Sequence, residues 1–587
     1  MKFRLLSLLL IFSGLTASAQ TLTWWNPARS LVNVLEGKGW PEEAASLYDR
    51  FPARAEKAVR PPVWNLSRNS AGMMIRFRSN ADQIVVRYAV GGAHAMPHMP
   101  ATGVSGVDLY AVNSDGGLLW CSGKYAFKDT VSYTFAGLIP SDPYHPKGRE
   151  YRLYLPLYNS VKWLEIGVPE GAVFSPLPAR LEKPIVVYGT SIAQGACASR
   201  PGMAWPAIIG RQLDRPVINL GFSGNGRMEK ETVDLVAELD AKVFLIDCLP
   251  NLIATVNIPE EEIRKRYLEG VRALRAKHPT TPIVLAEHAG YTEAGTNLTR
   301  KKYFEDVNRW IREVFEQLKS EGITGLSLIP QAQFGQDVET MVDGTHPSDL
   351  GMMRYAEGYI KALRGILNEP EGTIATTRPV TQNRDAAIYD WQLRHREVLS
   401  LTKTRKPKLV FMGNSITHYW SGVPQAPIER GKDAWMSVLE PRGAMNFGFG
   451  WDRIENVLWR VYHDELDGFD AKQVVLLIGT NNLQFNTDAE ITDGLKFLIG
   501  AIRKRQPGAS VLVLGILPRR GQEVRLKGLN EQLKIMTSGA GAAFSDPGKS
   551  LLKSDQTIDE SLFTDGLHPN GKGYSRIAKE LDAVLLR

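Results

Sequence analysis

Four short sequence blocks each occur twice in this chain of 587 residues, in the same order both times. The first pair holds Ser191 and Ser415, which lie 224 positions apart, and the last pair holds His346 and His568, which lie 222 positions apart. Such a nearly constant offset indicates an internal duplication, so one fold must suit both halves. The four pairs are YGTSI and MGNSI, VINLGFSGNG and MNFGFGWD, VFLIDCLPN and VVLLIGTNN, and DGTHPSDLG and DGLHPNGKG.

Each half alternates short apolar segments with polar segments that favour helix, such as 259–277 and 300–320. This alternation predicts a parallel sheet with helices on both faces, in which ligands bind beyond the carboxyl ends of the strands. The serine, glycine and asparagine blocks fall at those ends. Strands are predicted at 185–189, 217–220, 243–248, 282–287 and 326–329 in the first half, and at 408–412, 445–448, 474–478 and 511–517 in the second.

The region before the first repeat has a different pattern. Apolar and polar residues alternate in stretches such as 73–90, and few long helical patterns occur, which predicts an all-β sandwich. Between the halves lies a segment rich in Pro, Thr and polar residues that is typical of a linker. The predicted organisation is a β-sandwich accessory domain at 20–180, an α/β domain at 181–367, a linker at 368–384 and a second α/β domain at 385–587.

The first residues have the pattern of a secretory signal peptide, assigned to 1–19. Lys2 and Arg4 precede the apolar run 5–12, and Ala-Ser-Ala ends at position 19. No later stretch is apolar for long enough to span a bilayer, so we expect a soluble, exported chain that is periplasmic or secreted. Removal of the signal lowers the net charge from +7 to +5, and no basic block suggests nucleic-acid binding.

Cysteine and histidine give little sign of metal or disulfide chemistry. Three cysteines in so long a chain exclude a disulfide scaffold and allow at most one bridge, which Cys197 and Cys248 could form. No CxxC pair suggests zinc. His94 and His98 are spaced i, i+4, but Pro97 between them opposes a helix, so no metal site is predicted.

The repeated blocks together fit nucleophilic catalysis by serine. A serine that follows a strand needs a base to remove its proton, and the histidine of each Asp-x-x-His block can be that base while its aspartate orients the imidazole. Glycine and asparagine turns can donate N–H groups to a developing oxyanion. Singly, each block also fits a simple βα turn, a helix N-cap or a loop, but their joint occurrence twice in one chain favours catalysis.

The same blocks resemble those of the SGNH (GDSL-type) hydrolases, esterases named for their Ser, Gly, Asn and His residues. The resemblance implies flavodoxin-like α/β domains and no metal or organic cofactor. The second half is similar to the subgroup related to platelet-activating-factor acetylhydrolase, through MGNSI, NFGFGWDRIENVLWR and IGTNN. The resemblance assigns it Ser415, Asp565 and His568 as catalytic residues and Trp451 and Asn481 as oxyanion donors, with Trp451 standing where that subgroup has glycine.

The first half resembles bacterial SGNH esterases, and GVDLY at 106–110 resembles a motif of the accessory domain that precedes them. For this half the resemblance implies Ser191, Asp343 and His346 as catalytic residues and Gly224 and Asn251 as oxyanion donors. The block from Asp247 to Asn251 departs from the common Gly-x-Asn-Asp pattern and is expected to be longer than its counterpart.

The expected function is that of an exported carboxylic-ester hydrolase acting through an acyl-enzyme. The resemblance and the predicted export favour an acetylated glycan as substrate, either acetylated polysaccharide or O-acetylated sialic acid. A lysophospholipase or short-chain lipid esterase remains an alternative, as does a glycan-binding protein in which one SGNH domain is degenerate. The sequence predicts no oligomeric state.

Overall fold

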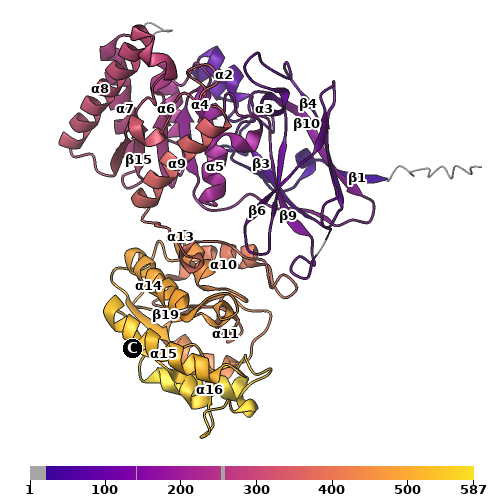
Figure 1. The fold of residues 1–587 in the computed structure, drawn as a ribbon, viewed down its shortest axis with the longest axis vertical. Coiled ribbons are helices and arrows are strands. Elements are labelled where there is room, and N and C mark those ends of the chain that lie inside the picture. The colour runs from indigo at the N-terminus through magenta and orange to yellow at the C-terminus, as the bar shows by residue number, and fades with distance from the viewer. Residues whose placement is uncertain (1–20, 141, 253–257, 587) are drawn as a thin grey trace, which may run out of the picture.

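The computed structural model describes residues 21–140, 142–252 and 258–586. The predicted signal peptide lies outside them. Figure 1 shows three parts: an indigo β-sandwich, a magenta α/β half beside it, and an orange-to-yellow α/β half below. None of the helices in the described part combines the length and the apolar character that a bilayer span requires.

The N-terminal part confirms the predicted sandwich, because two antiparallel sheets enclose an apolar core. Along one central strand the alternate residues Ile84, Val86 and Tyr88 are buried, as the period-two pattern requires. One sheet has the order β1 (Leu22–Trp25), β10 (Val161–Pro169), β4 (Gln83–Val90), β8 (Val131–Ala136) and β7 (Lys124–Ala126). The other has the order β11 (Phe174–Pro176), β3 (Met74–Ser79), β9 (Arg149–Tyr154), β5 (Asp108–Val112) and β6 (Leu118–Cys121), with β2 (Leu35–Glu36) beside β3.

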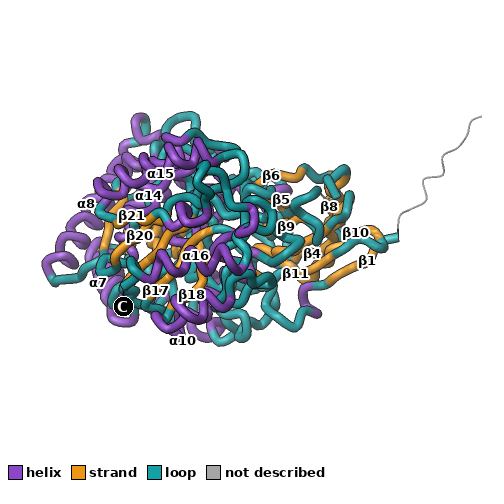
Figure 2. The backbone as a smooth tube through the Cα atoms, turned by 90° about the horizontal axis from the view of Figure 1, so that it is seen from below, coloured by secondary structure: helices purple, strands orange, loops and turns teal. Residues whose placement is uncertain are grey.

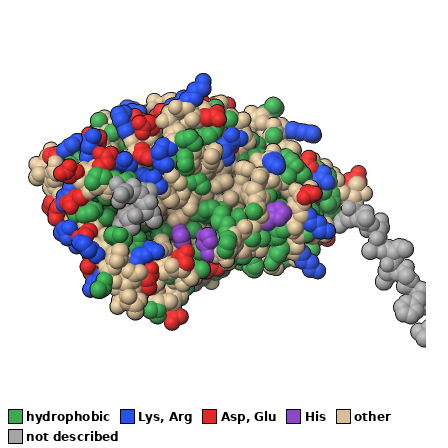
Figure 3. Space-filling view, turned by 90° about the horizontal axis from the view of Figure 1, so that it is seen from above, with side chains coloured by type: hydrophobic (Ala, Val, Ile, Leu, Met, Phe, Trp, Pro, Cys, Tyr) green, Lys and Arg blue, Asp and Glu red, His purple; other side chains and the backbone are tan. Residues whose placement is uncertain are grey.

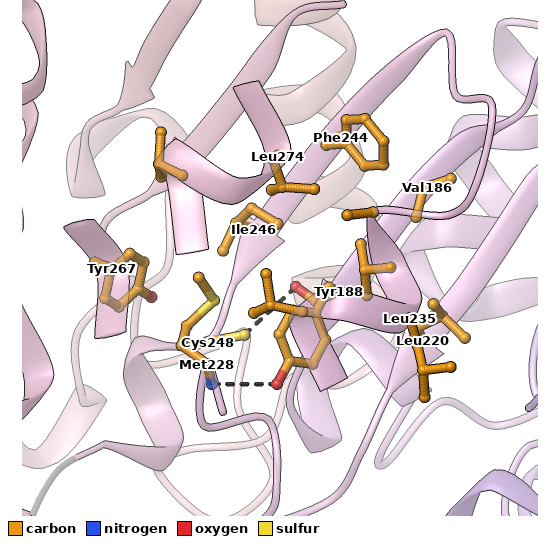
Figure 4. Packing of buried hydrophobic residues seen from close by; sticks show 14 of the residues in the cluster. Val186, Tyr188, Leu220, Met228, Leu235, Phe244, Ile246, Cys248, Tyr267 and Leu274 are labelled. Carbon is orange, nitrogen blue, oxygen red and sulfur yellow. Dashed lines mark hydrogen bonds between the residues drawn. The ribbon is translucent and has the colours of Figure 1, made fainter. Parts of the chain in front are cut away.

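The first α/β half has the doubly wound order expected of a flavodoxin-like fold. Tyr188 lies in its core, where its hydroxyl accepts from Met228 N (3.1 Å) and its carbonyl accepts from Cys248 Sγ (3.6 Å) (Figure 4). All strands are parallel, in the order β13 (Val217–Gly221), β12 (Ile185–Gly189), β14 (Val243–Asp247), β15 (Ile283–Ala286) and β16 (Leu326–Ile329). The helices are α4 (Ser191–Gln194), α5 (Trp205–Gln212), α6 (Lys230–Val236), α7 (Glu260–Lys277), α8 (Leu298–Ser320) and α9 (Asp349–Ile366).

The second half repeats this topology. Helices α14 and α15 cover one face of its sheet and α16 covers the other (Figure 2). The strand order is β18 (Ala444–Gly448), β17 (Leu409–Gly413), β19 (Gln473–Leu477), β20 (Ser510–Leu514) and β21 (Ala543–Ser545). The helices are α10 (Trp391–Arg405), α11 (Ser415–His418), α12 (Lys432–Ala434), α13 (Ile454–Tyr462), α14 (Asp488–Arg505), α15 (Glu523–Ala540) and α16 (Gly571–Asp582).

Sheet register aligns the two halves residue by residue. Gly189 pairs with Gly221 and Asp247, and Gly413 pairs with Gly448 and Leu477. Counted from these pairs, Gly224 and Trp451 occupy equivalent positions in the two halves, and so do Asn251 and Asn481. The expectation of a longer block from Asp247 to Asn251 is therefore wrong, because both asparagines follow the last paired residue by the same number of positions.

Most buried residues of the stretch 37–67 pack onto the first α/β half, although Tyr48 lies in the core of the sandwich. This stretch includes helices α1 (Ala55–Ala58) and α2 (Pro61–Ser67), and Trp40, Phe51 and Val63 share a core cluster with strands β12 and β13. A third short helix, α3 (Ala101–Val104), lies between β4 and β5.

A buried arginine holds the edge strand of each α/β sheet. The guanidinium of Arg50 donates to the carbonyls of Asn219 (3.1 Å) and Gly221 (2.7 Å) in β13. In the second half, Arg394 of α10 donates to the corresponding carbonyls of Asn446 (3.0 Å) and Gly448 (2.7 Å) in β18. The two arginines therefore donate to the same edge-strand carbonyls in both sheets, as a neighbouring strand would.

The segment predicted as a linker, 368–384, is packed against the second half. Thr376 Oγ1 donates to Glu490 O (2.8 Å), and the buried amide of Gln382 donates to Gly450 O (2.8 Å). Glu369, at its start, accepts from Arg215 of the first half (2.8 Å) and Arg505 of the second (2.7 Å). The two α/β halves thus share a buried ionic contact.

One face of the molecule carries charged side chains of both signs. On the face drawn in Figure 3, basic and acidic side chains are mixed and lie mainly toward the edges, while uncharged side chains and some histidines occupy the middle. This face shows no continuous basic stripe of the kind that binds a phosphate backbone.

Candidate active sites

In the first half, the predicted serine, histidine and aspartate lie in one hydrogen-bonded row. Ser191 opens α4 directly after β12, with Thr190 as its N-cap. Its Oγ lies 2.9 Å from His346 Nε2, and His346 Nδ1 lies 2.8 Å from Asp343 Oδ2. The other oxygen of Asp343 accepts from the backbone N–H of His346 (2.8 Å), so the carboxylate fixes both the ring and its peptide.

The second half has the same arrangement. Ser415 opens α11 after β17, and its Oγ lies 2.8 Å from His568 Nε2. His568 Nδ1 lies 2.7 Å from Asp565 Oδ2, and the backbone N–H of His568 donates to Asp565 Oδ1 (2.7 Å). The structure therefore brings together all six predicted side chains, as two sets of three.

The protonation states that these contacts favour suit base catalysis by histidine. Burial opposes ionisation of Asp343 and Asp565, but hydrogen bonds from the neighbouring histidine outweigh it and hold the pKa of each carboxyl below its usual value. Burial lowers the pKa of His568 below its usual value despite the attraction of Asp565. His568 is therefore neutral, and able to accept a proton, near neutral pH.

The predicted backbone donors share an unusual conformation. Gly224 has φ 68° and Trp451 has φ 63°, so the tryptophan adopts the left-handed conformation that the glycine adopts in the other half. Neither N–H has a hydrogen-bond partner within residues 21–140, 142–252 and 258–586. Trp451 is 41% exposed, and its backbone keeps the conformation of the donor although the residue is not glycine.

The predicted asparagines stand beside these turns. Asn251 Oδ1 accepts from Gly226 N (3.1 Å), which leaves its amide NH₂ free to donate. Asn481 Nδ2 donates to Asp452 O (3.0 Å) and retains a second N–H. In each half a backbone N–H and a side-chain amide are thus available close to the serine turn, the combination that stabilises an oxyanion.

Two pairs of residues that the sequence did not single out support these turns. Gln194 and His418, each three positions after the serine, accept from the backbone N–H groups of Ser223 (3.0 Å) and Gly450 (3.1 Å), which directly precede Gly224 and Trp451. The signal in the sequence was a polar residue at the same position after the serine in both repeats. Asn219 and Asn446 likewise donate to the carbonyls of Ala193 and Thr417, each at 2.7 Å.

The GVDLY motif lies against the loop that follows the first serine helix. Asp108 is buried, accepts from Gly202 N (3.0 Å) and forms an ion pair with Arg200. A Cβ on Gly103, just before the motif, would approach Ala198 O to 2.2 Å, so the sandwich and this loop are in close contact. The motif therefore positions the surroundings of Ser191.

The same part of the sandwich carries a histidine to the first site. The ring of His98 lies 5.7 Å from that of His346, centroid to centroid, and Cys197 Sγ donates to His98 O (3.3 Å). All three cysteines are free, so Cys197 and Cys248 are not paired. Burial raises the pKa of Cys197 to about 12, so this residue is a thiol at neutral pH.

Comparison with known proteins matches each part of the chain. The model of the GDSL-like lipase/acylhydrolase family matches residues 182–364, and a second model with the same description matches 411–576. Residues 22–174 match the N-terminus of SGNH-hydrolase-type esterases. Rat platelet-activating factor acetylhydrolase IB subunit alpha1 is 32% identical over 224 residues, which cover 37% of this chain and 91% of the rat protein.

The chain belongs to the GDSL-like lipase/acylhydrolase family. The human alpha1 subunit is 33% identical over 202 residues, which cover 34% of this chain and 83% of the human protein. A protein from Bacteroides ovatus ATCC 8483, solved as a GDSL-like lipase, is 34% identical with a TM-score of 0.54 and covers 59% of this chain and 98% of its own. The tandem GDSL arrangement behind an accessory β-domain is thereby confirmed.

Proposed function

We propose that this member of the GDSL-like family is a carboxylic-ester hydrolase with two active sites. The observation that carries the proposal is the pair of Ser–His–Asp rows, with Oγ–Nε2 distances of 2.9 and 2.8 Å. Each row stands at the carboxyl end of a doubly wound sheet, where such folds bind ligands. Ser191 and Ser415 are the proposed nucleophiles.

In each site the serine Oγ attacks the ester carbonyl while the histidine Nε2 accepts its proton. The aspartate stabilises the imidazolium that forms. The proposed oxyanion donors are the N–H and amide pairs Gly224 with Asn251 and Trp451 with Asn481. The histidine then protonates the departing alcohol, and a water molecule, deprotonated by the same histidine, releases the acid from the acyl-enzyme.

We propose O-acetyl groups on carbohydrate as the substrate class. Acetyl is the acyl group named in the relatives called acetylhydrolases. The rim of the first site is polar, since His98 is exposed and Arg300 donates to Thr345 beside His346 (3.3 Å). Near the second site, Trp451 and Phe485 are exposed, and aromatic side chains suit contact with sugar rings.

Export to the periplasm or outside the cell belongs to the same proposal. It rests on the basic and apolar N-terminal pattern that ends at Ala19. Sequencing the N-terminus of the protein recovered outside the cytoplasm should give Gln20 as the first residue. Recovery of full-length protein from the cytoplasm alone would contradict it.

The decisive experiment separates the two sites. Ser191→Ala, Ser415→Ala and the double variant are assayed on 4-nitrophenyl acetate. Each single variant should keep the activity of the other site, and the double variant should lose ~10³-fold or more. Normal hydrolysis by the double variant would refute both serine assignments, and full loss in one single variant would identify the other half as inactive.

Substrate class is then tested by acetate release from acetylated polysaccharides and O-acetylated sialic acids. A lipid esterase, the main alternative, would hydrolyse longer acyl chains faster than acetyl. A glycan-binding protein with one degenerate domain would bind the same glycans while one single variant loses all activity.

A further inference from the structure

Three side chains with metal-binding atoms converge at the first site. They are His98 from the sandwich, Cys197 from the loop after α4, and the proposed base His346. One ligand atom from each lies within 4.8 Å of the other two. Two imidazoles and one thiolate are a donor set that Zn²⁺ prefers.

The surroundings of this cluster match a metal site in two further respects. His346 Nδ1 is held by Asp343 (2.8 Å), and a ligating histidine commonly makes this carboxylate contact through its other nitrogen. His346 Nε2, on the side of Ser191, is then the nitrogen left to bind a metal. Three protein ligands leave one position of a tetrahedral metal open. Ser191 Oγ lies beside the cluster, 2.9 Å from His346 Nε2.

The geometry needs only small movements to hold a metal. Zinc with ordinary Zn–N and Zn–S bonds places two nitrogens and one sulfur about 3.3–3.6 Å apart in a tetrahedron. His98 is exposed, so its ring can rotate toward the other two ligands. The Ser191 turn holds the segment of Cys197 in place, and Asp343 holds that of His346.

We propose that His98, Cys197 and His346 form an inhibitory site for Zn²⁺ or a similar transition-metal ion. Binding converts the Cys197 thiol to a thiolate and releases one proton to solvent, with no change of oxidation state. The metal occupies His346 Nε2, which then cannot accept the proton of Ser191. Metal binding and ester hydrolysis at the first site therefore exclude each other.

The second site provides an internal control, because it lacks this cluster. Ser421 stands at the position of Cys197 and donates to Glu429 (2.7 Å). The ring of Tyr419 lies 5.9 Å from that of His568, centroid to centroid, and tyrosine is not one of the ligand types of the first site. Within the described ranges, the first site holds the only group of three such ligands.

Binding is tested first without any assay of hydrolysis, on the Ser191→Ala/Ser415→Ala double variant. Added Co²⁺ should produce a thiolate-to-metal charge-transfer band that Zn²⁺ abolishes by competition. Cys197→Ser should remove the band, and His98→Gln should weaken binding by more than the ~10–100-fold that loss of an outer contact costs. Matched controls are Cys121→Ser, another buried thiol, and His94→Gln from the same loop, and both should bind normally.

Inhibition rests on the proposed function and is tested separately. Zn²⁺ should inhibit Ser415→Ala, in which only the first site works, and should leave Ser191→Ala active. Cobalt binding without any esterase activity would refute the proposed function and leave the metal site intact. Absence of the band, its persistence in both Cys197→Ser and His98→Gln, or equal inhibition of the two serine variants would overturn the inference. Since His98 is exposed, its variant remains decisive even if Cys197→Ser misfolds.

Discussion

At the residue scale, Trp451 shows that the left-handed backbone of the oxyanion turn is kept when tryptophan stands in place of glycine. Left-handed backbone costs a residue with a Cβ roughly 1–2 kcal/mol relative to glycine. The expectation that this position supplies an oxyanion N–H depends on that backbone, and Gly224 and Trp451 share it within a few degrees of φ.

We therefore expect Trp451→Gly to be more stable than Trp451→Ala by about 1 kcal/mol, because both lose the indole but only alanine keeps the strain. Thermal unfolding of the two variants measures the difference. Gly224→Ala is the matched change in the first half and should cost a similar amount. Equal stability of the Trp451 pair would mean that the left-handed backbone is not strained.

The pKa of His568 sets the lowest pH at which the second site can work. Burial disfavours its charged form and lowers its pKa, so the ring stays neutral to lower pH than an ordinary histidine, whose pKa is about 6.5. In the Ser191→Ala variant, kcat/KM should therefore fall on acidification with a midpoint below about 6.5. A midpoint above that value would show that the imidazolium is favoured in the free enzyme.

At the scale of elements, the short helices α4 and α11 connect the serine to the oxyanion turn. Gln194 is fully buried, accepts from Ser223 N, and donates to Asn69 Oδ1 and Leu157 O, each at 3.1 Å. The amide thus joins the turn of the first site to the sandwich.

Gln194→Ala should lower the free energy of unfolding by about 1–3 kcal/mol, because it leaves buried polar groups unpaired. It should also reduce kcat at the first site and not at the second, which the serine variants resolve. Gln212→Ala, on an exposed position of α5, serves as the control. Equal losses at both sites would argue against a local role.

The GVDLY contact acts at the same scale. Asp108→Asn removes the charge that pairs with Arg200, and hydrogen bonds to charged groups contribute about 1.5–3 kcal/mol. We expect a loss of that size in stability and a reduced rate at the first site only. Asp129→Asn, an exposed change in the sandwich, should have neither effect; an unaltered first site in Asp108→Asn would contradict the positioning role.

Local pattern predicted most elements and failed where contacts are long-range. The apolar runs at 185–189 and 243–248 became strands β12 and β14, because a Val/Ile/Leu run between turn signals has few other stable forms. Strand β21 was not predicted, since its three residues are partly exposed and pair only with β20. His98 approaches His346 from a separate domain, and no local pattern encodes that distance.

At the scale of the molecule, Glu369 joins the two α/β halves. It is nearly fully buried and accepts from both Arg215 and Arg505. Glu369→Ala leaves two cations without their shared carboxylate, and loss of one partner of a buried pair costs about 3–5 kcal/mol. We expect a lower Tm, whereas Glu357→Ala on the exposed side of α9 should leave Tm unchanged; equal Tm values would show that solvent compensates the arginines.

The sandwich also contacts both halves. Besides the loop near Ser191, it reaches the second half through Asp115, which pairs with Arg453 (3.1 Å), and through Ser114, whose carbonyl accepts from Asn383 (2.9 Å). Arg453 lies two residues after Trp451. One domain is therefore in contact with the oxyanion turn of one site and the serine loop of the other.

The arginine that holds each edge strand has a consequence for how the chain is divided. Arg394 comes shortly before the first strand of its half, but Arg50 precedes β12 by more than a hundred residues, most of which belong to the sandwich. The repeated α/β unit thus corresponds in the first half to two separated stretches, with most of the sandwich between them. A truncation at residue 181 would remove an integral piece of the first hydrolase unit, whereas the second unit is contiguous.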